Sequence, residues 1–478
     1  MATPSENQFL EPDIPPVIHA PEDQPPPLIP PAQESAPFFQ RSDWFTCALT
    51  TALVLVGYLW TLAPDVTLDR SGVYATGAMY AGGMPPSGYP LWVIYAWLFT
   101  KLLPFSNIAW RVAVSSAVAG ALTCGLIALM TARAGSLILD GLRTNRRLNP
   151  RDETRLRITC GCIAGLAFGF DNTFWNFAVI VEVWPFSLLL LTIVLVLLMR
   201  WFYAPARRRY LYAAAFMYGL TLTNSEALLT AAFGLQLFIF IGDRELGRDL
   251  FFANILLLLA LLGAEKGGFI GLGYGTLHHL RGWYIGIAIV SAQLCFGMIL
   301  VTRRFLTKWL PASVVVLMVF AGLMMFLYLP VSSMTTPPLN WGYARTLEGF
   351  VHVLGRGQFE APYPTESFGR YFGQLQFYFQ IASDDFGLLY LLAALIPFCL
   401  LHRMRSPERR WLLGTLAIYL CLSLLMVALL NPPTDTGIRN LVKIFFTASH
   451  IILALWTGLG LILLGTRLNR PPAVSRNS

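Results

Sequence analysis

Charged side chains are scarce in this sequence. They make up 13% of the 478 residues, whereas 56% are hydrophobic and the mean hydropathy is +0.59. A soluble domain has about 25% charged residues. A larger core cannot explain the difference, because the fraction of surface that folding buries levels off as domains grow. The composition therefore predicts that lipid is the solvent for much of the surface.

The N-terminus also lacks the basic stretch and adjoining apolar run of a secretory signal peptide. Residues 1–42 are instead rich in proline and acidic side chains. Such a segment buries too little apolar area to offset the entropy lost on ordering. We therefore predict a disordered cytoplasmic tail over 1–42, a transmembrane domain over 43–466 that begins with a retained anchor, and a second cytoplasmic tail over 467–478.

No basic helix and no basic patch interleaved with aromatic residues is evident, so the net charge of +8 does not indicate nucleic-acid binding. The seven cysteines lie in or at the edge of apolar segments, and Cys160 and Cys162 lack a second pair that would complete a zinc site. We interpret them as small buried hydrophobic residues. The sequence predicts no dedicated metal.

About twelve apolar segments are candidates for helices that cross a bilayer, so the predicted fold is all-α and polytopic. Tyr89–Leu103 contains Lys101 and is flanked by prolines, which favours an interfacial helix over a span. The predicted spans are Trp44–Ala63, Ile108–Ala132, Ile158–Phe170, Ile180–Arg200, Tyr210–Leu222, Leu228–Ile241, Leu250–Gly263, Trp283–Thr302, Leu310–Leu329, Phe386–Leu401, Leu412–Leu430 and Ile444–Leu464.

Arginines mark one set of the connecting loops. In this arrangement they all fall on one side of the membrane, which the positive-inside rule identifies as cytoplasmic, together with both termini. The opposite face has longer loops, chiefly 64–107 and 330–385, and no glycosylation sequon, which is compatible with a bacterial inner membrane. The arginine-bearing segments start at Arg133, Arg207, Arg244, Arg303, Arg403 and Arg467.

The first outer loop offers two carboxylates, Asp65 and Asp69. A partly desolvated carboxylate near the bilayer has a raised pKa, which suits it to accept a proton from a hydroxyl group. An Asp69–Arg70 ion pair or a helix cap would explain the same residues. From the residues alone these interpretations are equally good.

Several segments together resemble a known family. They are residues 71–92 with 105–120, then Thr173–Trp175 with Glu182–Trp184, then Gly219–Asn224, and finally Tyr328–Pro330 with Pro337–Gly342. Over about Trp44 to Phe359 the chain resembles the domain of unknown function 2723, a family that includes the transmembrane protein 260 type of protein O-mannosyltransferase. The chain departs from that family at several positions. The acidic residue Asp69 is shifted by one position, Val73 stands where a glutamate is expected, and Ser225 stands where a histidine is expected. Residues 85–88 read Pro-Pro-Ser-Gly where the family often has a histidine before Pro-Pro-Gly.

The resemblance implies a C-type glycosyltransferase fold. Such an enzyme moves a sugar from a polyprenyl-phosphate carrier in the outer leaflet to an acceptor hydroxyl, on a protein or a glycan, and needs no cofactor besides this lipid-linked co-substrate. Asp69 matches the catalytic base and Glu182 a family glutamate, while Arg345 or Arg356 would hold the phosphate. The other substrate-binding residues that the resemblance suggests are Arg70, Tyr89, Trp175, Asn224, Glu226, Asn340 and Trp341.

Other interpretations remain open. Glu182 and Glu226 could serve structural hydrogen bonds, and the arginines among the outer aromatic residues could belong to an interfacial belt. The whole chain could be a transporter or lipid flippase, or an inactive homologue that acts as a scaffold. The gathering of ionisable residues at one face favours an enzyme.

Overall fold

The computed structural model describes residues 37–67, 70–142, 149–266, 276–355, 363–433, 439 and 442–468. Asp69 and Arg356 therefore lie outside the described residues, as do most of the predicted N-terminal tail and nearly all of the C-terminal one. By its contacts the chain divides after Phe38, and the unit Phe39–Ser478 contains every described helix.

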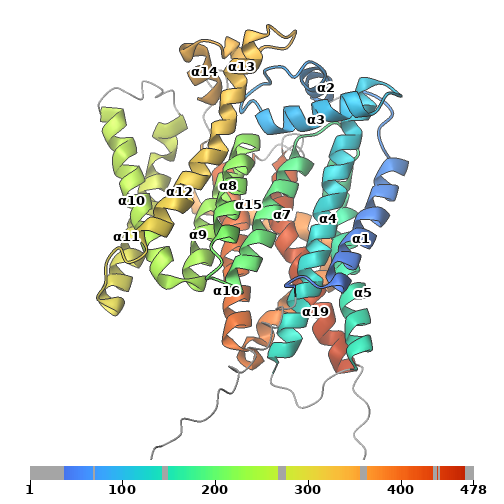
Figure 1. The fold of residues 1–478 in the computed structure, drawn as a ribbon, viewed down its shortest axis with the longest axis vertical. Coiled ribbons are helices and arrows are strands. Elements are labelled where there is room, and N and C mark those ends of the chain that lie inside the picture. The colour runs from blue at the N-terminus through green and yellow to red at the C-terminus, as the bar shows by residue number, and fades with distance from the viewer. Residues whose placement is uncertain are drawn as a thin grey trace, which may run out of the picture. The chain divides into compact units, whose positions relative to one another are not determined.

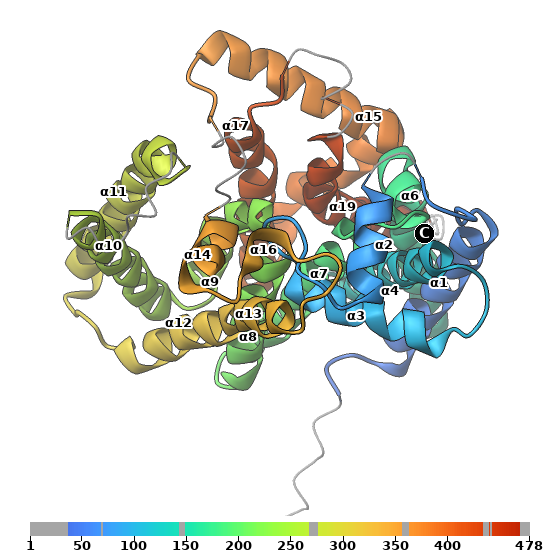
Figure 2. The same cartoon turned by 90° about the horizontal axis from the view of Figure 1, so that it is seen from above.

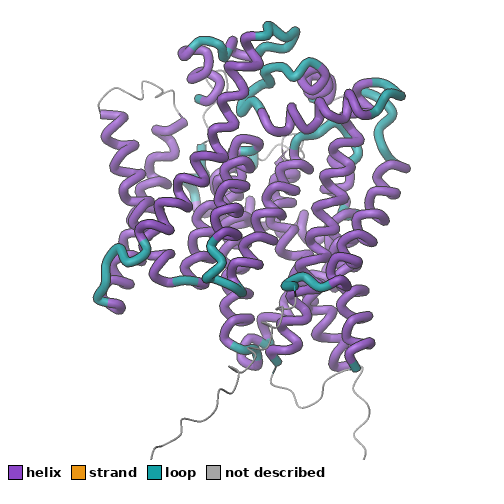
Figure 3. The backbone as a smooth tube through the Cα atoms, viewed as in Figure 1, coloured by secondary structure: helices purple, strands orange, loops and turns teal. Residues whose placement is uncertain are grey.

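Figure 3 shows the described part of this unit as helices joined by loops. Gly83 and Asn340 form one isolated β-bridge between described residues. The helices follow one another in the order drawn in Figure 1. They are α1 (Arg41–Trp60), α2 (Ser71–Met79), α3 (Pro90–Leu102), α4 (Ile108–Gly141), α5 (Pro150–Gly169), α6 (Asn172–Ala178), α7 (Trp184–Phe202), α8 (Arg209–Asn224), η1 (Glu226–Thr230), α9 (Ala231–Gly242), α10 (Arg244–Lys266), α11 (Thr276–Thr302), α12 (Trp309–Leu323), η2 (Met324–Leu327), α13 (Tyr328–Met334), η3 (Trp341–Tyr343), α14 (Leu347–Leu354), α15 (Phe368–Cys399), η4 (Leu401–Arg403), α16 (Ser406–Leu420), η5 (Cys421–Leu425), α17 (Met426–Leu430), η6 (Lys443–Phe446) and α19 (Thr447–Leu468).

A helix forms at each of the predicted spans, and nine of the described helical segments are long and apolar enough to cross a membrane. The chain is therefore an integral, multi-pass membrane protein. The remaining predicted spans correspond to α5, α8 and α9. The first turns of α5 carry several charged side chains, while α8 has 16 residues and α9 has 12, fewer than the roughly 20 that a bilayer requires.

The predicted end of the second span is wrong by more than two turns. We expected a loop from Arg133, but α4 runs on to Gly141 and keeps Arg133 inside the helix. Charge ends the apolar run there without ending the helix. Two other arginines near this side, Arg157 and Arg248, are buried rather than solvated, and Arg248 donates to Asp249 and to the carbonyl of Arg304 at 2.7 and 2.6 Å.

Mostly buried helices occupy the middle of the bundle. The apolar windows of α4, α7 and α19 are largely buried, whereas those of α1, α11 and α12 are largely exposed. Small residues allow close packing between helices. At the crossing of α8 and α12, a Cβ on Gly219 would lie 2.2 Å from the carbonyl oxygen of Val319, so only glycine fits there.

The two ends of the bundle differ. In Figure 1 the short helices α2, α3, α13 and α14 gather at the upper end, and α3 lies across it, while the described connections after α7, α11 and α15 lie lower down. Seen from above in Figure 2, the first part of α15 runs across the view instead of along it. α15 breaks at Gly387, whose φ of 72° is in the left-handed region that favours glycine.

Candidate active site

The turn into α2 brings a basic and an aromatic residue together at the upper end of the bundle. Arg70 immediately precedes α2, and its guanidinium donates a hydrogen bond to the hydroxyl of Tyr74, one turn later. The Tyr74 ring meets the edges of Tyr89 and Trp92 at centroid distances of 6.0 and 5.7 Å. Tyr74 is thereby fixed between the loop and α3.

Glu182 lies near the same residues. Burial, and after it the Glu182 carboxylate, raises the pKa of Tyr74 well above its usual value, so that hydroxyl remains protonated. The pKa of Arg70 is raised as well: desolvation opposes its charge, but Tyr74, Tyr89 and Glu182 outweigh that effect. The structure therefore groups three predicted site residues, Arg70, Tyr89 and Glu182, around Tyr74.

The backbone of Glu182 is anchored before α7 begins. The hydroxyl of Ser116 on α4 donates to the carbonyl of Glu182 at 2.9 Å and accepts from its N–H at 3.1 Å. One carboxylate oxygen accepts the N–H of Val183 at 2.8 Å. The half-buried side chain thus has a fixed position two residues before α7, beside the Arg70–Tyr74 pair.

Other predicted site residues make bonds that hold the fold. Asn224 is fully buried at the end of α8, where it donates to Ser187 of α7 at 2.7 Å and accepts the N–H of Trp92 at 3.2 Å. Trp175 donates to the hydroxyl of Thr61, at the end of α1, at 3.0 Å. Glu226 is exposed at the start of η1.

The long outer segment is docked on the first outer loop. The N–H of Trp341 donates to the carbonyl of Gly83 at 3.1 Å, and Asn340 forms the bridge with the same glycine. Tyr328 and Ser332 donate to the carbonyl of Ala81. Two segments that are far apart in the sequence therefore form one surface at the upper end of the bundle in Figure 1. The exposed Arg345 contacts the ring of Tyr343, at 6.0 Å.

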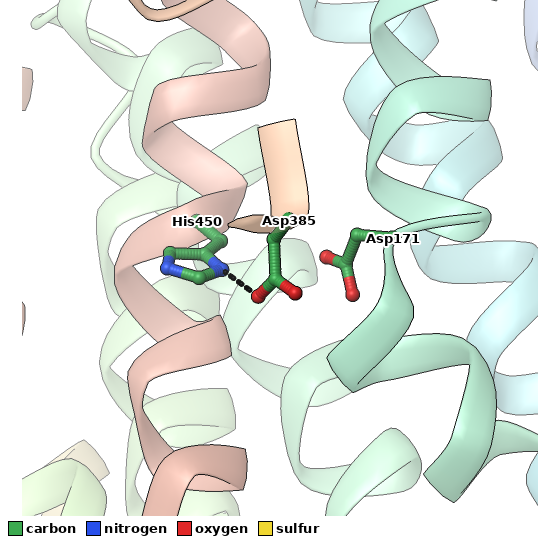
Figure 4. Close-up of side chains that lie close together, drawn as sticks. All are labelled: Asp171, Asp385 and His450. Carbon is green, nitrogen blue, oxygen red and sulfur yellow. Dashed lines mark ion pairs between the residues drawn. The ribbon is translucent and has the colours of Figure 1, made fainter. Parts of the chain in front are cut away.

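A second polar cluster lies in the interior, and it was not predicted from the sequence. Asp171 at the start of α6, Asp385 on α15 and His450 on α19 point toward one another (Figure 4). Nothing in the sequence pairs these residues, because each belongs to a different helix. Tyr74 was not predicted either, because the sequence indicates a loop for this stretch, whereas in the structure Tyr74 lies one turn into α2, which begins at Ser71.

Comparisons with known proteins support part of the resemblance. Residues 71–247 match the family described as the Protein O-mannosyl-transferase TMEM260 N-terminal domain. Protein O-mannosyl-transferase TMEM260 of Mus musculus is 26% identical over 181 residues, which are 37% of this chain and 23% of the mouse protein. The alignment thus spans less than a quarter of that relative. No solved structure matches the chain.

The matched segment is shorter than the Trp44–Phe359 stretch that we expected to resemble the family. It includes Tyr74, Tyr89, Glu182 and Asn224, and it starts one residue after Arg70. The likeness to this family is confirmed for 71–247, while the roles of individual residues remain predictions.

Proposed function

We propose that this protein is a membrane glycosyltransferase that moves mannose from a polyprenyl-phosphate carrier to a serine or threonine hydroxyl of a protein, at the outer face of the membrane. The observation that carries the proposal is the match of residues 71–247 to a protein O-mannosyl-transferase domain. The fold proposed with it is that of the C-type glycosyltransferases, with about twelve spans and both termini in the cytoplasm.

The proposed reaction is a displacement at the anomeric carbon. The acceptor oxygen forms a bond to that carbon, the bond from the carbon to the phosphate oxygen breaks, and polyprenyl phosphate leaves. Asp69 accepts the hydroxyl proton as general base. Arg70, together with Arg345 or Arg356 of the long outer segment, compensates the negative charge of the phosphate.

Glu182 is proposed to orient the acceptor. Its position, fixed by Ser116 and Val183, and its proximity to Tyr74 and Arg70 support this role. A carboxylate held at one place can accept a hydrogen bond from a sugar or acceptor hydroxyl at little entropic cost. Tyr74, whose hydroxyl stays protonated, positions the Arg70 guanidinium.

The test is a transfer assay with the purified full-length protein, polyprenyl-phosphate mannose and a serine- and threonine-rich peptide. Asp69→Asn should lower kcat by at least about a hundredfold. Asp65→Asn is the matched control, because Asp65 lies in the same loop, is exposed, and accepts the N–H of its neighbour Val66. It should retain activity.

Each alternative predicts a different result. Equal activity of Asp69→Asn and the wild type would refute the assignment of the base. A wild-type protein that transfers no sugar to any hydroxyl acceptor would refute the proposed function. Movement of the lipid-linked sugar across a vesicle bilayer without transfer would identify the protein as a flippase.

A further inference from the structure

Three helices bring ionisable side chains together in the interior. Asp171 is the N-cap of α6, Asp385 lies two residues before the break of α15 at Gly387, and His450 is one turn into α19. Their side chains are buried, with exposures of 1% for Asp171 and Asp385 and 0% for His450. One potential ligand atom from each residue lies within 4.8 Å of the other two.

One oxygen of each carboxylate already has a partner. Asp171 accepts the N–H of Phe174, and Asp385 Oδ1 accepts the N–H and the hydroxyl of Thr173 at 3.2 and 2.9 Å. These bonds fix both carboxylates against α6. They leave the second oxygen of each for another partner.

The remaining atoms have no hydrogen-bond partner among the described residues. They are Oδ2 of Asp171, Oδ2 of Asp385, and both ring nitrogens of His450. His450 Nδ1 and Asp385 Oδ2 are 3.4 Å apart, and Figure 4 shows the Asp171 carboxylate facing Asp385 from the other side. Buried polar atoms without partners are costly, so this arrangement calls for a bound species that engages several of them at once.

A divalent cation meets that need better than a proton. The N–H of a neutral His450 and one added proton would join these atoms only in pairs, whereas a metal ion binds two carboxylates and an imidazole together and compensates both negative charges. Two oxygen donors and one nitrogen donor suit Zn²⁺, Mn²⁺ or Fe²⁺. With metal–ligand bonds of about 2.0–2.2 Å, donor atoms on one ion lie roughly 3–3.5 Å apart, so the present separations of up to 4.8 Å need to shorten by at most about 1.8 Å.

We propose that Asp171, Asp385 and His450 bind one divalent transition-metal cation of the zinc class. The ion fastens the first part of α15 to α6 and α19. The site is separate from the proposed transfer chemistry and does not depend on it. The metal site is nevertheless linked to the segment that holds Glu182, because both involve α19. Trp184, two residues after Glu182, donates to Thr447 at the start of α19 at 2.8 Å.

The experiment measures binding directly. The full-length protein, purified with a tag free of histidine and stripped with a chelator, is loaded with Zn²⁺, Mn²⁺ or Co²⁺, and its metal content and affinity are determined. One ion per chain is expected, with Co²⁺ giving visible absorption bands that Zn²⁺ displaces. Asp385→Asn should weaken binding more than about a hundredfold, since even outer-shell partners of a metal site contribute about 10–100-fold. Asp384→Asn, the adjacent and exposed carboxylate, is the matched control and should bind as the wild type does.

A second variant identifies the ligand even where Asp385→Asn does not fold. His450→Cys should add a thiolate-to-cobalt charge-transfer band that the wild type lacks, whereas His402→Gln, which alters an exposed histidine, should leave the spectrum unchanged. A wild-type protein that binds none of these ions in a 1:1 ratio would overturn the proposal. So would equal binding by Asp384→Asn and Asp385→Asn, or a thiolate band in the wild type, which would assign the metal to a native cysteine.

Discussion

At the scale of single residues, Tyr74 gives the sharpest test of the candidate site that Arg70, Tyr89 and Glu182 form around it. Tyr74→Phe removes the hydroxyl that accepts from Arg70 but keeps the ring contacts with Tyr89 and Trp92. Because the Arg70 guanidinium is exposed and partly screened by water, we expect this bond to contribute at most about 1 kcal/mol and its loss to slow transfer by roughly fivefold. Stability should change little, since Arg70 is exposed and can bond to water instead.

Steady-state kinetics and thermal unfolding of the same preparation check this prediction. Tyr80→Phe, which alters an exposed tyrosine at the end of the same helix, is the control and should match the wild type. If Tyr74→Phe had wild-type kcat and KM, the Arg70–Tyr74 pair would have no part in positioning the substrate.

Asn224 leads to the opposite prediction. Asn224→Ala breaks two buried bonds, to Ser187 and to the N–H of Trp92. The N–H of Trp92 loses its partner, and Ser187 keeps only its bond to the carbonyl of Val183, at 3.4 Å. Such a loss costs about 1–3 kcal/mol, so the melting temperature should fall while the activity per folded molecule is retained. A variant that melts like the wild type but transfers no sugar would instead make Asn224 a substrate-binding residue.

At the scale of helices, the crossing of α8 and α12 depends on two glycines. A Cβ on Gly219 would lie 2.2 Å from the carbonyl of Val319, and one on Gly322 would lie 2.4 Å from the carbonyl of Phe216. Either alanine substitution must push the helices apart, and we expect a loss of about 1–3 kcal/mol and a lower yield of folded protein. Gly286→Ala on α11, where a Cβ would meet nothing within 4 Å, is the control and should be neutral or slightly stabilising. The measurement is the melting temperature in detergent. If Gly219→Ala and Gly286→Ala had the same melting temperature, α8 and α12 would not approach this closely.

The helices themselves were predictable because their signals are local. Apolar length and flanking charge are properties of about 20 neighbouring residues, so each predicted span contains a helix. Helix ends were less predictable: α4 continues past Arg133 to Gly141, so the end of an apolar run is not the end of the helix. Glu182 and Arg70 were predicted as site residues because each lies in a short segment that resembles the family. The cluster of Asp171, Asp385 and His450 could not be found, since its contacts join residues such as Thr173 and Asp385 that are 212 positions apart.

At the scale of the whole molecule, the functional proposal depends on which end of the bundle faces the cytoplasm. Single cysteines in place of exposed residues, read out with a thiol reagent that cannot cross the membrane, determine this. Cysteine at Tyr80 or Arg345 should react in intact cells, whereas cysteine at Arg207 or Arg405 should react only after permeabilisation. The physical reason is that arginines resist translocation, which keeps their loops in the cytoplasm.

The chain suits this experiment because six of its seven native cysteines are buried, and Cys399→Ser removes the exposed one. If positions 80 and 207 were labelled from the same side, an odd number of the proposed spans between them would not cross the membrane. We would then expect α5 to be the one that does not, because its first turns are charged. If only positions 207 and 405 were labelled in intact cells, the orientation of the protein would be the reverse of the one proposed. Arg70 and Glu182 would then face the cytoplasm, out of reach of a sugar carrier in the outer leaflet, and the transfer proposal would fail while the helical fold stood.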